Sequence, residues 1–161
     1  MACKSPHALT KSELLEKIRA ELRANLERLV RAASEAHAAA TDPGSKAEGK
    51  YDTRSLEASY LAAGQARQVD ELAASLRTFE ALNLPAFEPH HAIDAGALVE
   101  TQLYSETSYF LLVPSAGGLV LFHEGMEITL LTPESPLYQQ MLGLHVGHSL
   151  NSPPLTITAV H

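Results

Sequence analysis

The chain has 161 residues, of which 45% are hydrophobic and 19% are charged, a composition typical of a globular protein with one or two domains. No apolar run approaches the roughly 18–20 residues of a membrane span, and the N-terminus has no apolar signal core. The single cysteine, Cys3, excludes an intrachain disulfide and a cysteine-based zinc cluster. We therefore expect a cytoplasmic protein with no membrane partner.

The charges are distributed unevenly along the chain. All 12 Lys and Arg residues lie at or before Arg77, and the 12 acidic residues that precede Asn83 balance them. From Asn83 onward the chain has seven acidic residues and no Lys or Arg. An acidic surface attracts basic partners and is poorly suited to a phosphate backbone, which requires cations. The C-terminal half therefore favours a basic partner over direct contact with nucleic acid.

Residues 10–84 carry two long amphipathic helical patterns, and residues 1–9 are predicted to be disordered. Apolar residues recur at steps of three and four from Leu15 to Ala40 and again from Leu56 to Phe79. Between the patterns lies Pro43-Gly44, a pair suited to a chain reversal. The sequence therefore predicts an antiparallel helical hairpin, a coiled coil whose alanine-rich far half is slender.

The connection between the two helices is rich in carboxylates. Two carboxylates can share a Mg²⁺ ion and orient a water molecule for phosphoryl chemistry. The candidates for such a pair are Asp42, Glu48, Asp52 and Glu57.

Beyond a proline-containing linker at 85–95, the period of the pattern changes from 3.6 to 2. Short β-type runs at 97–103, 107–113, 119–123, 126–131 and 155–160 predict an antiparallel sheet. We expect hairpin turns at 115–118 and 124–125, and a short helix from Pro136 to Leu142. Six of the eight histidines lie beyond residue 89, and we interpret them as surface groups. The predicted second domain spans 96–161, so the whole chain belongs to the α+β class.

Two segments resemble the bacterial Gre transcript-cleavage and elongation factors. The segment Leu131-Thr132-Pro133-Glu134-Ser135-Pro136-Leu137, followed by Met141-Leu142-Gly143 and Val146-Gly147, is similar to a motif of that family's FKBP-like C-terminal domain. The segment Glu57-Ala58-Ser59-Tyr60-Leu61-Ala62-Ala63 is similar to the stretch that follows the family's acidic tip. The resemblance covers about residues 10–160 in the same domain order.

This resemblance implies a monomeric protein that is not itself an enzyme and that acts on the transcription elongation complex. It implies that an FKBP-like domain at 96–161 docks on RNA polymerase through Pro133, Ser135, Pro136 and Leu137. The coiled coil then enters the secondary channel of the polymerase. We expect no stably bound cofactor, although the tip could share Mg²⁺ with the polymerase.

Two alignments of the tip compete. If Tyr51 matches the tyrosine of the family, Asp42 and Glu48 are the metal-binding and catalytic pair; if Tyr60 matches it, Asp52 and its neighbours are. We favour Asp42 and Glu48. Neither alignment reproduces the family's Asp-x-x-Glu spacing. Three hypotheses therefore stay open: a factor that stimulates cleavage of backtracked RNA, a non-cleaving competitor for the channel, and, from the FKBP-like fold alone, a prolyl isomerase.

Overall fold

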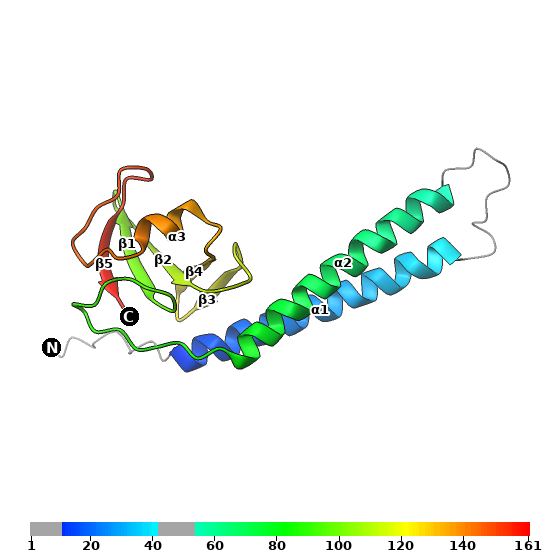
Figure 1. Ribbon diagram of the computed structural model, residues 1–161, viewed down its shortest axis with the longest axis horizontal. Coiled ribbons are helices and arrows are strands. Elements are labelled where there is room, and N and C mark those ends of the chain that lie inside the picture. Colours follow the sequence, from blue (N-terminus) through cyan, green and yellow to red (C-terminus); the bar gives the residue numbers. More distant parts are fainter. Residues whose placement is uncertain (1–10, 42–53) are drawn as a thin grey trace. The chain divides into compact units, whose positions relative to one another are not determined.

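The structure is a computed structural model that describes residues 11–41 and 54–161 (Figure 1). It divides into two compact units. Residues 19–80 form the helical unit, and residues 81–161 together with the start of the first helix, up to Ile18, form the sheet unit. Among the helices that the structure describes, none combines the length and the apolar character that a membrane span requires.

The helical unit is built from most of α1 (Lys11–Thr41, 31 residues) and α2 (Arg54–Ala81, 28 residues). The two helices run side by side in Figure 1. Arg19 Nε donates a hydrogen bond of 2.8 Å to the carbonyl of Phe79, and the Arg23 guanidinium lies 3.4 Å from the Glu80 carboxylate. Because the first part of α1 thus meets the last turn of α2, the helices are antiparallel, and the predicted helical hairpin is confirmed.

Burial within the helical unit declines toward the connection between the helices. Leu22 and Phe79 are fully buried, whereas Val30 and Leu61 are 45% and 59% exposed. The alanines Ala33 and Ala36 lie half-buried on α1. Burial of large apolar side chains stabilises paired helices. The stability of this unit therefore comes mainly from the half that contains Leu22 of α1 and Phe79 of α2.

The sheet unit contains five strands in the order β3-β4-β2-β1-β5. Their bounds are β1 Leu98–Leu103, β2 Glu106–Leu112, β3 Val120–His123, β4 Met126–Leu131 and β5 Thr156–Val160. The pairs β1–β2, β1–β5 and β3–β4 are antiparallel. Helices and sheet together confirm the α+β class.

The expected all-antiparallel sheet requires one correction, because β2 and β4 are parallel. The predicted hairpin at 115–118 is wrong for the same reason. After β2, Val113 donates to the carbonyl of Leu131 at 2.8 Å, and Gly118 then donates to that of Leu130 at 2.9 Å. The chain therefore passes around the end of β4 and returns as β3 on its other side. The predicted turn at Glu124-Gly125 is confirmed, since both residues have positive φ, of 49° and 80°.

Both faces of the sheet are covered. One face packs against α3 (Pro136–Met141), whose Tyr138 and Met141 join a buried cluster that also contains Val99, Leu112 and Ile157. Residues of the alternate set, such as Leu98, Leu111 and Ile128, are 0% exposed as well. Side chains alternate between the two faces of a strand, so each face has a buried apolar centre, while Val120 and Phe122 at the β3 edge are exposed.

The outer edge of β5 is paired with the loop that precedes it. Gly147 donates to the carbonyl of Ile157 at 2.8 Å, and Ile157 donates to that of His148 at 2.9 Å. At the other edge of the sheet, the Lys17 amine donates to the carbonyl of Phe122 in β3.

Residues 85–95, expected as a linker, are packed into the sheet unit. Ile93 is 1% exposed, donates to the carbonyl of Leu144 at 2.8 Å and accepts from Gly143 at 2.8 Å. Two prolines remove helical periodicity from this segment without preventing an extended chain from packing.

Candidate functional site

The sequence placed functional residues in two regions, and the structure describes one of them. Asp42 and Glu48, the predicted metal-binding and catalytic pair, lie outside the described residues, as does Asp52. Pro133, Ser135, Pro136 and Leu137, the predicted docking residues, lie in the sheet unit between β4 and the first turn of α3. We refer to Pro133, Glu134, Ser135, Pro136 and Leu137 together as the 133–137 surface.

The backbone of the 133–137 surface is braced by its own hydrogen bonds. Ser135 donates its backbone N–H to the carbonyl of Thr132 at 2.8 Å and closes a turn. The side-chain amide of Gln139 donates to the carbonyl of Pro133 at 2.8 Å. Pro136 occupies the first position of α3, where its fixed φ suits the helix and its missing N–H has no cost. These contacts hold the segment in one conformation.

The side chains of this surface face two ways. Pro133, Glu134 and Pro136 are exposed, whereas Ser135 and Leu137 are half-buried. Immediately behind them Tyr138 and Met141 are buried in the core cluster. Burial is the main reason that the pKa of Tyr138 is raised, and the negative charge of Asp94 adds to the effect. Tyr138 therefore anchors α3, and the exposed prolines are free to contact a partner.

The electrostatics of the sheet unit are strongly negative. Six of the seven acidic residues after Asn83 are exposed, and Glu100 is half-buried beside the Thr158 hydroxyl, which donates to it at 2.8 Å. The Thr132 side chain donates to the Glu134 carboxylate, and this hydrogen bond is the main cause of the lowered pKa of Glu134. A carboxylate thus stays ionised in the middle of the 133–137 surface.

The start of α1 adds two cations that the sequence did not assign to this unit. Lys11 Nζ donates to the carbonyls of Pro85 and Gly96 at 2.6 and 2.8 Å and lies 4.5 Å from the centre of the Phe87 ring. Burial lowers the pKa of Lys11 to about 8. Lys11 and Lys17 both donate to backbone carbonyls and not to carboxylates. The exposed carboxylates of the unit therefore keep their negative charge unneutralised by these two lysines.

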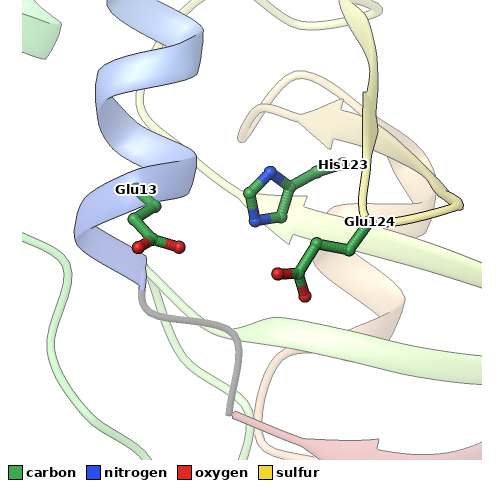
Figure 2. Close-up of side chains that lie close together, drawn as sticks. All are labelled: Glu13, His123 and Glu124. Atoms are coloured by element: carbon green, nitrogen blue, oxygen red, sulfur yellow. The ribbon is translucent and has the colours of Figure 1, made fainter. Parts of the chain in front are cut away.

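A second cluster, which the sequence did not predict, joins Glu13, His123 and Glu124. Each side chain offers one ligand atom, and the three atoms lie within 4.8 Å of one another. Figure 2 shows all three side chains directed toward a common space, with Glu13 coming from α1, His123 from the end of β3 and Glu124 from the turn that follows it. The adjacent His-Glu pair at a predicted turn was a visible signal. Its partner Glu13 is more than 100 positions away, and no local pattern connects it to the turn.

The aromatic residues give the prolyl isomerase hypothesis no support. Tyr138 is buried in the core, whereas Phe122 and Tyr104 are 64% and 85% exposed. In the part of the chain that the structure describes, the ring–ring contacts all involve histidine, and none joins two of Phe87, Phe110, Phe122, Tyr104, Tyr109 and Tyr138. Tyr109 and Phe110 line one pocket whose other walls are polar or charged side chains, and Phe87 is the only one of these six residues that lines a second pocket, so neither pocket is lined mainly by aromatic side chains.

Solved structures of Gfh1 proteins are similar to this chain. No family model matches the chain, and no curated protein matches it. Among solved structures, the GreA factor homolog 1 (Gfh1) protein of Thermus thermophilus is 24% identical over 89% of this chain and 94% of that chain, with a TM-score of 0.35. A structure of the transcription factor Gfh1 is 23% identical over 89% and 92% of the chains, with a TM-score of 0.37. Thermus aquaticus Gfh1 is 19% identical over 88% and 92%, with a TM-score of 0.34. The chain is thus similar to Gre factor homologues, the family that its motifs resemble.

Proposed function

We propose that this protein is a Gre-like regulator of transcription elongation that docks on RNA polymerase through the 133–137 surface. The observation that carries the proposal is that the segment with the family's Ser-Pro motif forms an exposed, hydrogen-bonded turn on an acidic unit. Preorganised apolar groups surrounded by charges are suited to protein recognition, because little conformational entropy is lost on binding. The antiparallel hairpin of α1 and α2 is the part that enters the secondary channel.

Docking is tested by measuring the affinity of the full-length protein for RNA polymerase. The variant Pro133→Ala/Pro136→Ala trims two exposed side chains and leaves the buried Tyr138 in place. Truncation of anchoring side chains at an interface costs more than about 1 kcal/mol, so we expect affinity to fall at least about fivefold. Pro89→Ala, which trims another exposed proline of the same unit, is the matched control. Equal affinity of the double variant and the control would contradict docking through this surface.

The acidic character of the sheet unit predicts a salt dependence. An acidic surface that meets a basic partner loses affinity as ionic strength rises from about 0.1 M to 1 M, because the screening length falls from about 10 Å to about 3 Å. Glu134→Lys should reduce affinity at low salt more than Glu106→Lys does, since Glu106 is an exposed carboxylate at the start of β2, away from the 133–137 surface.

Whether the protein stimulates RNA cleavage or competes with factors that do so depends on Asp42 and Glu48. The assay is a stalled, backtracked elongation complex with Mg²⁺, in which wild type is compared with Asp42→Ala and Glu48→Ala. Cleavage of the RNA 3′ end that either change abolishes assigns the two carboxylates as ligands of a shared Mg²⁺. Absence of cleavage, combined with inhibition of an authentic cleavage factor in the same reaction, assigns the competitor function. The departure from Asp-x-x-Glu spacing favours the competitor.

A further inference from the structure

We propose that Glu13, His123 and Glu124 bind one borderline divalent cation such as Zn²⁺, which links the first turn of α1 to the β3–β4 turn. This site lies within the sheet unit, so the proposal is independent of whether the protein binds RNA polymerase. It differs from the Mg²⁺ site expected at Asp42 and Glu48, which lies elsewhere in the chain and consists of carboxylates alone.

The first argument concerns the histidine. Nε2 of His123 is buried from solvent and has no hydrogen-bond partner. Buried polar atoms in folded proteins are nearly always paired, and an unpaired one therefore requires an explanation. In Figure 2 one nitrogen of this ring points toward the space between the two carboxylates. A metal ion at that position would complete the coordination of the imidazole.

The second argument concerns the ligand set and its dimensions. Imidazole suits Zn²⁺ and other late first-row cations, and carboxylates complete many such sites. Bonds of about 2.0–2.2 Å to a tetrahedral ion place neighbouring ligand atoms about 3.4 Å apart. The present separations of up to 4.8 Å therefore require the ligand atoms to approach one another by at most about 1.4 Å. Glu13 and Glu124 are exposed and can rotate by this amount, and a water molecule would supply the fourth ligand.

The third argument concerns the turn. Glu124 and Gly125 form a two-residue loop in which both have positive φ. The first position of such a loop favours Asn, Asp or Gly, because these residues tolerate a left-handed backbone. A glutamate is not selected there by the backbone. The glutamate side chain is longer than that of Asn or Asp, and its carboxylate extends toward His123 and Glu13 (Figure 2).

The charges around the cluster are compatible with a cation. Lys17 lies one turn after Glu13 on α1, but its ammonium donates to the carbonyl of Phe122. On the hairpin, Glu127 is opposite Phe122, whereas His123 is opposite Met126. Neighbouring residues of a strand point to opposite faces, so Glu127 lies on the face of the hairpin away from the cluster.

Three variants remove one ligand each and leave the local fold intact. Glu13→Gln keeps a hydrogen-bonding side chain of the same length. His123→Gln keeps a polar side chain. Glu124→Asn places a residue that the turn prefers, so it should maintain or raise the melting temperature without metal while it abolishes the metal-dependent increase. Glu127→Gln is the matched control, since it removes the same charge from the same hairpin on the other face.

The experiment titrates ZnCl₂ alone into the full-length protein, with calorimetry for affinity and ¹⁵N NMR for the histidine rings. We expect one Zn²⁺ per chain, a shift of the His123 ring nitrogens, a rise in melting temperature that chelator reverses, and weaker binding of Mg²⁺. Each ligand variant should raise the Kd at least about tenfold, and Glu127→Gln should not change it. Equal affinity in all four variants would overturn the proposal. So would Zn²⁺ that shifts the His90–His91 or His145–His148 signals and leaves His123 unchanged.

Discussion

Lys11 contacts the segment that leads into the sheet, and its replacement tests how that segment is held. Its Nζ donates to the carbonyls of Pro85 and Gly96, and the charge lies 4.5 Å from the centre of the Phe87 ring. Lys11→Met keeps most of the aliphatic stem and removes the ammonium. The carbonyl of Gly96, which is in a half-buried contact, then loses a donor.

Two opposing contributions determine the magnitude of the effect. Hydrogen bonds from a charged donor contribute roughly 1.5–3 kcal/mol each when shielded, and the exposed bond to Pro85 contributes less. Against this, burial lowers the pKa of Lys11 from 10.5 to about 8, which shows that the charged form is penalised. Because part of the side chain stays in contact with water, we reduce that penalty to about 1–2 kcal/mol. The lost bonds exceed the relieved penalty, and we expect a net destabilisation of about 1 kcal/mol at pH 7.

The pH dependence gives a second readout. Between pH 8 and pH 10.5 the folded state has a neutral Lys11 and the unfolded state a charged one, so the unfolded state binds the additional proton. The free energy of unfolding of the wild type therefore rises with pH across this window through this group. The methionine variant lacks this contribution, so its destabilisation relative to wild type should be larger at pH 9.5 than at pH 7.

Urea unfolding, followed by the near-ultraviolet signal of the tyrosines, measures both effects. Three of the five tyrosines, Tyr104, Tyr109 and Tyr138, lie in the sheet unit that contains Lys11. Arg31→Met, at an exposed position of α1, removes one charge from the same helix and should change the free energy of unfolding by less than about 0.5 kcal/mol. A destabilisation that shrinks as the pH rises above 8 would refute the reasoning, because the pKa of Lys11 would then be higher in the folded state than in the unfolded state.

Three further predictions concern packing and titration. Gly117→Ala should destabilise the protein by about 1–3 kcal/mol, because the new Cβ would lie 2.7 Å from Oγ1 of Thr132. Gly64→Ala should stabilise it by about 0.5–1 kcal/mol, because this helical position has open space for a Cβ. Urea unfolding of both variants measures the difference. Phe79→Ala should cost about 3–5 kcal/mol, because this side chain is 0% exposed, and a loss below about 1 kcal/mol in thermal unfolding would contradict its place in the core. Thr132→Val should raise the pKa of Glu134, because the lowered value depends mainly on the hydrogen bond from Thr132; NMR titration of the Glu134 carboxyl carbon measures this change. In the wild type, the stability that this hydrogen bond contributes should be lost as the pH falls through the pKa of Glu134 in the folded state.

The helical hairpin could be predicted from the sequence because its determinants are local. Apolar residues at steps of three and four defined both helices, and α1 and α2 begin and end within a few residues of the expected positions. The half-buried and buried positions on α2, such as Val69, Leu72 and Leu76, follow the same period. This information is contained in a few consecutive turns of each helix.

The pairing of the strands could be predicted only in part. Alternation identified the five strands and the Glu124-Gly125 turn, since both signals come from neighbouring residues. It could not show that β4 pairs with both β2 and β3, because alternation defines the faces of a strand and not its neighbours. The Gly117-Gly118 pair therefore predicted a hairpin, although it belongs to the connection that passes around the end of β4.

The candidate site could likewise be predicted only in part from the sequence. Pro136 at the start of a short helix was visible in the sequence. The role of Tyr138 as a core anchor and the approach of Glu13 to His123 depend on tertiary packing. Lys11 and Lys17 were assigned to the helical hairpin, because the sequence does not show that one continuous helix begins in one compact unit and continues into the other.

The hydrogen bond between Lys17 and Phe122 has a consequence for self-association. An edge strand presents unpaired backbone groups to which a strand of another molecule can add, and β3 also exposes 41% of Val120 and 64% of Phe122. The lysine occupies one of these carbonyls and places a charge at the edge, while the loop at 147–150 covers the opposite edge along β5. A chain that lacks residues 1–17 would present an apolar, unprotected edge and should form strand-paired oligomers in a concentration-dependent manner. We therefore expect the start of α1 to protect this edge of the sheet from strand addition, a task distinct from any that the hairpin performs.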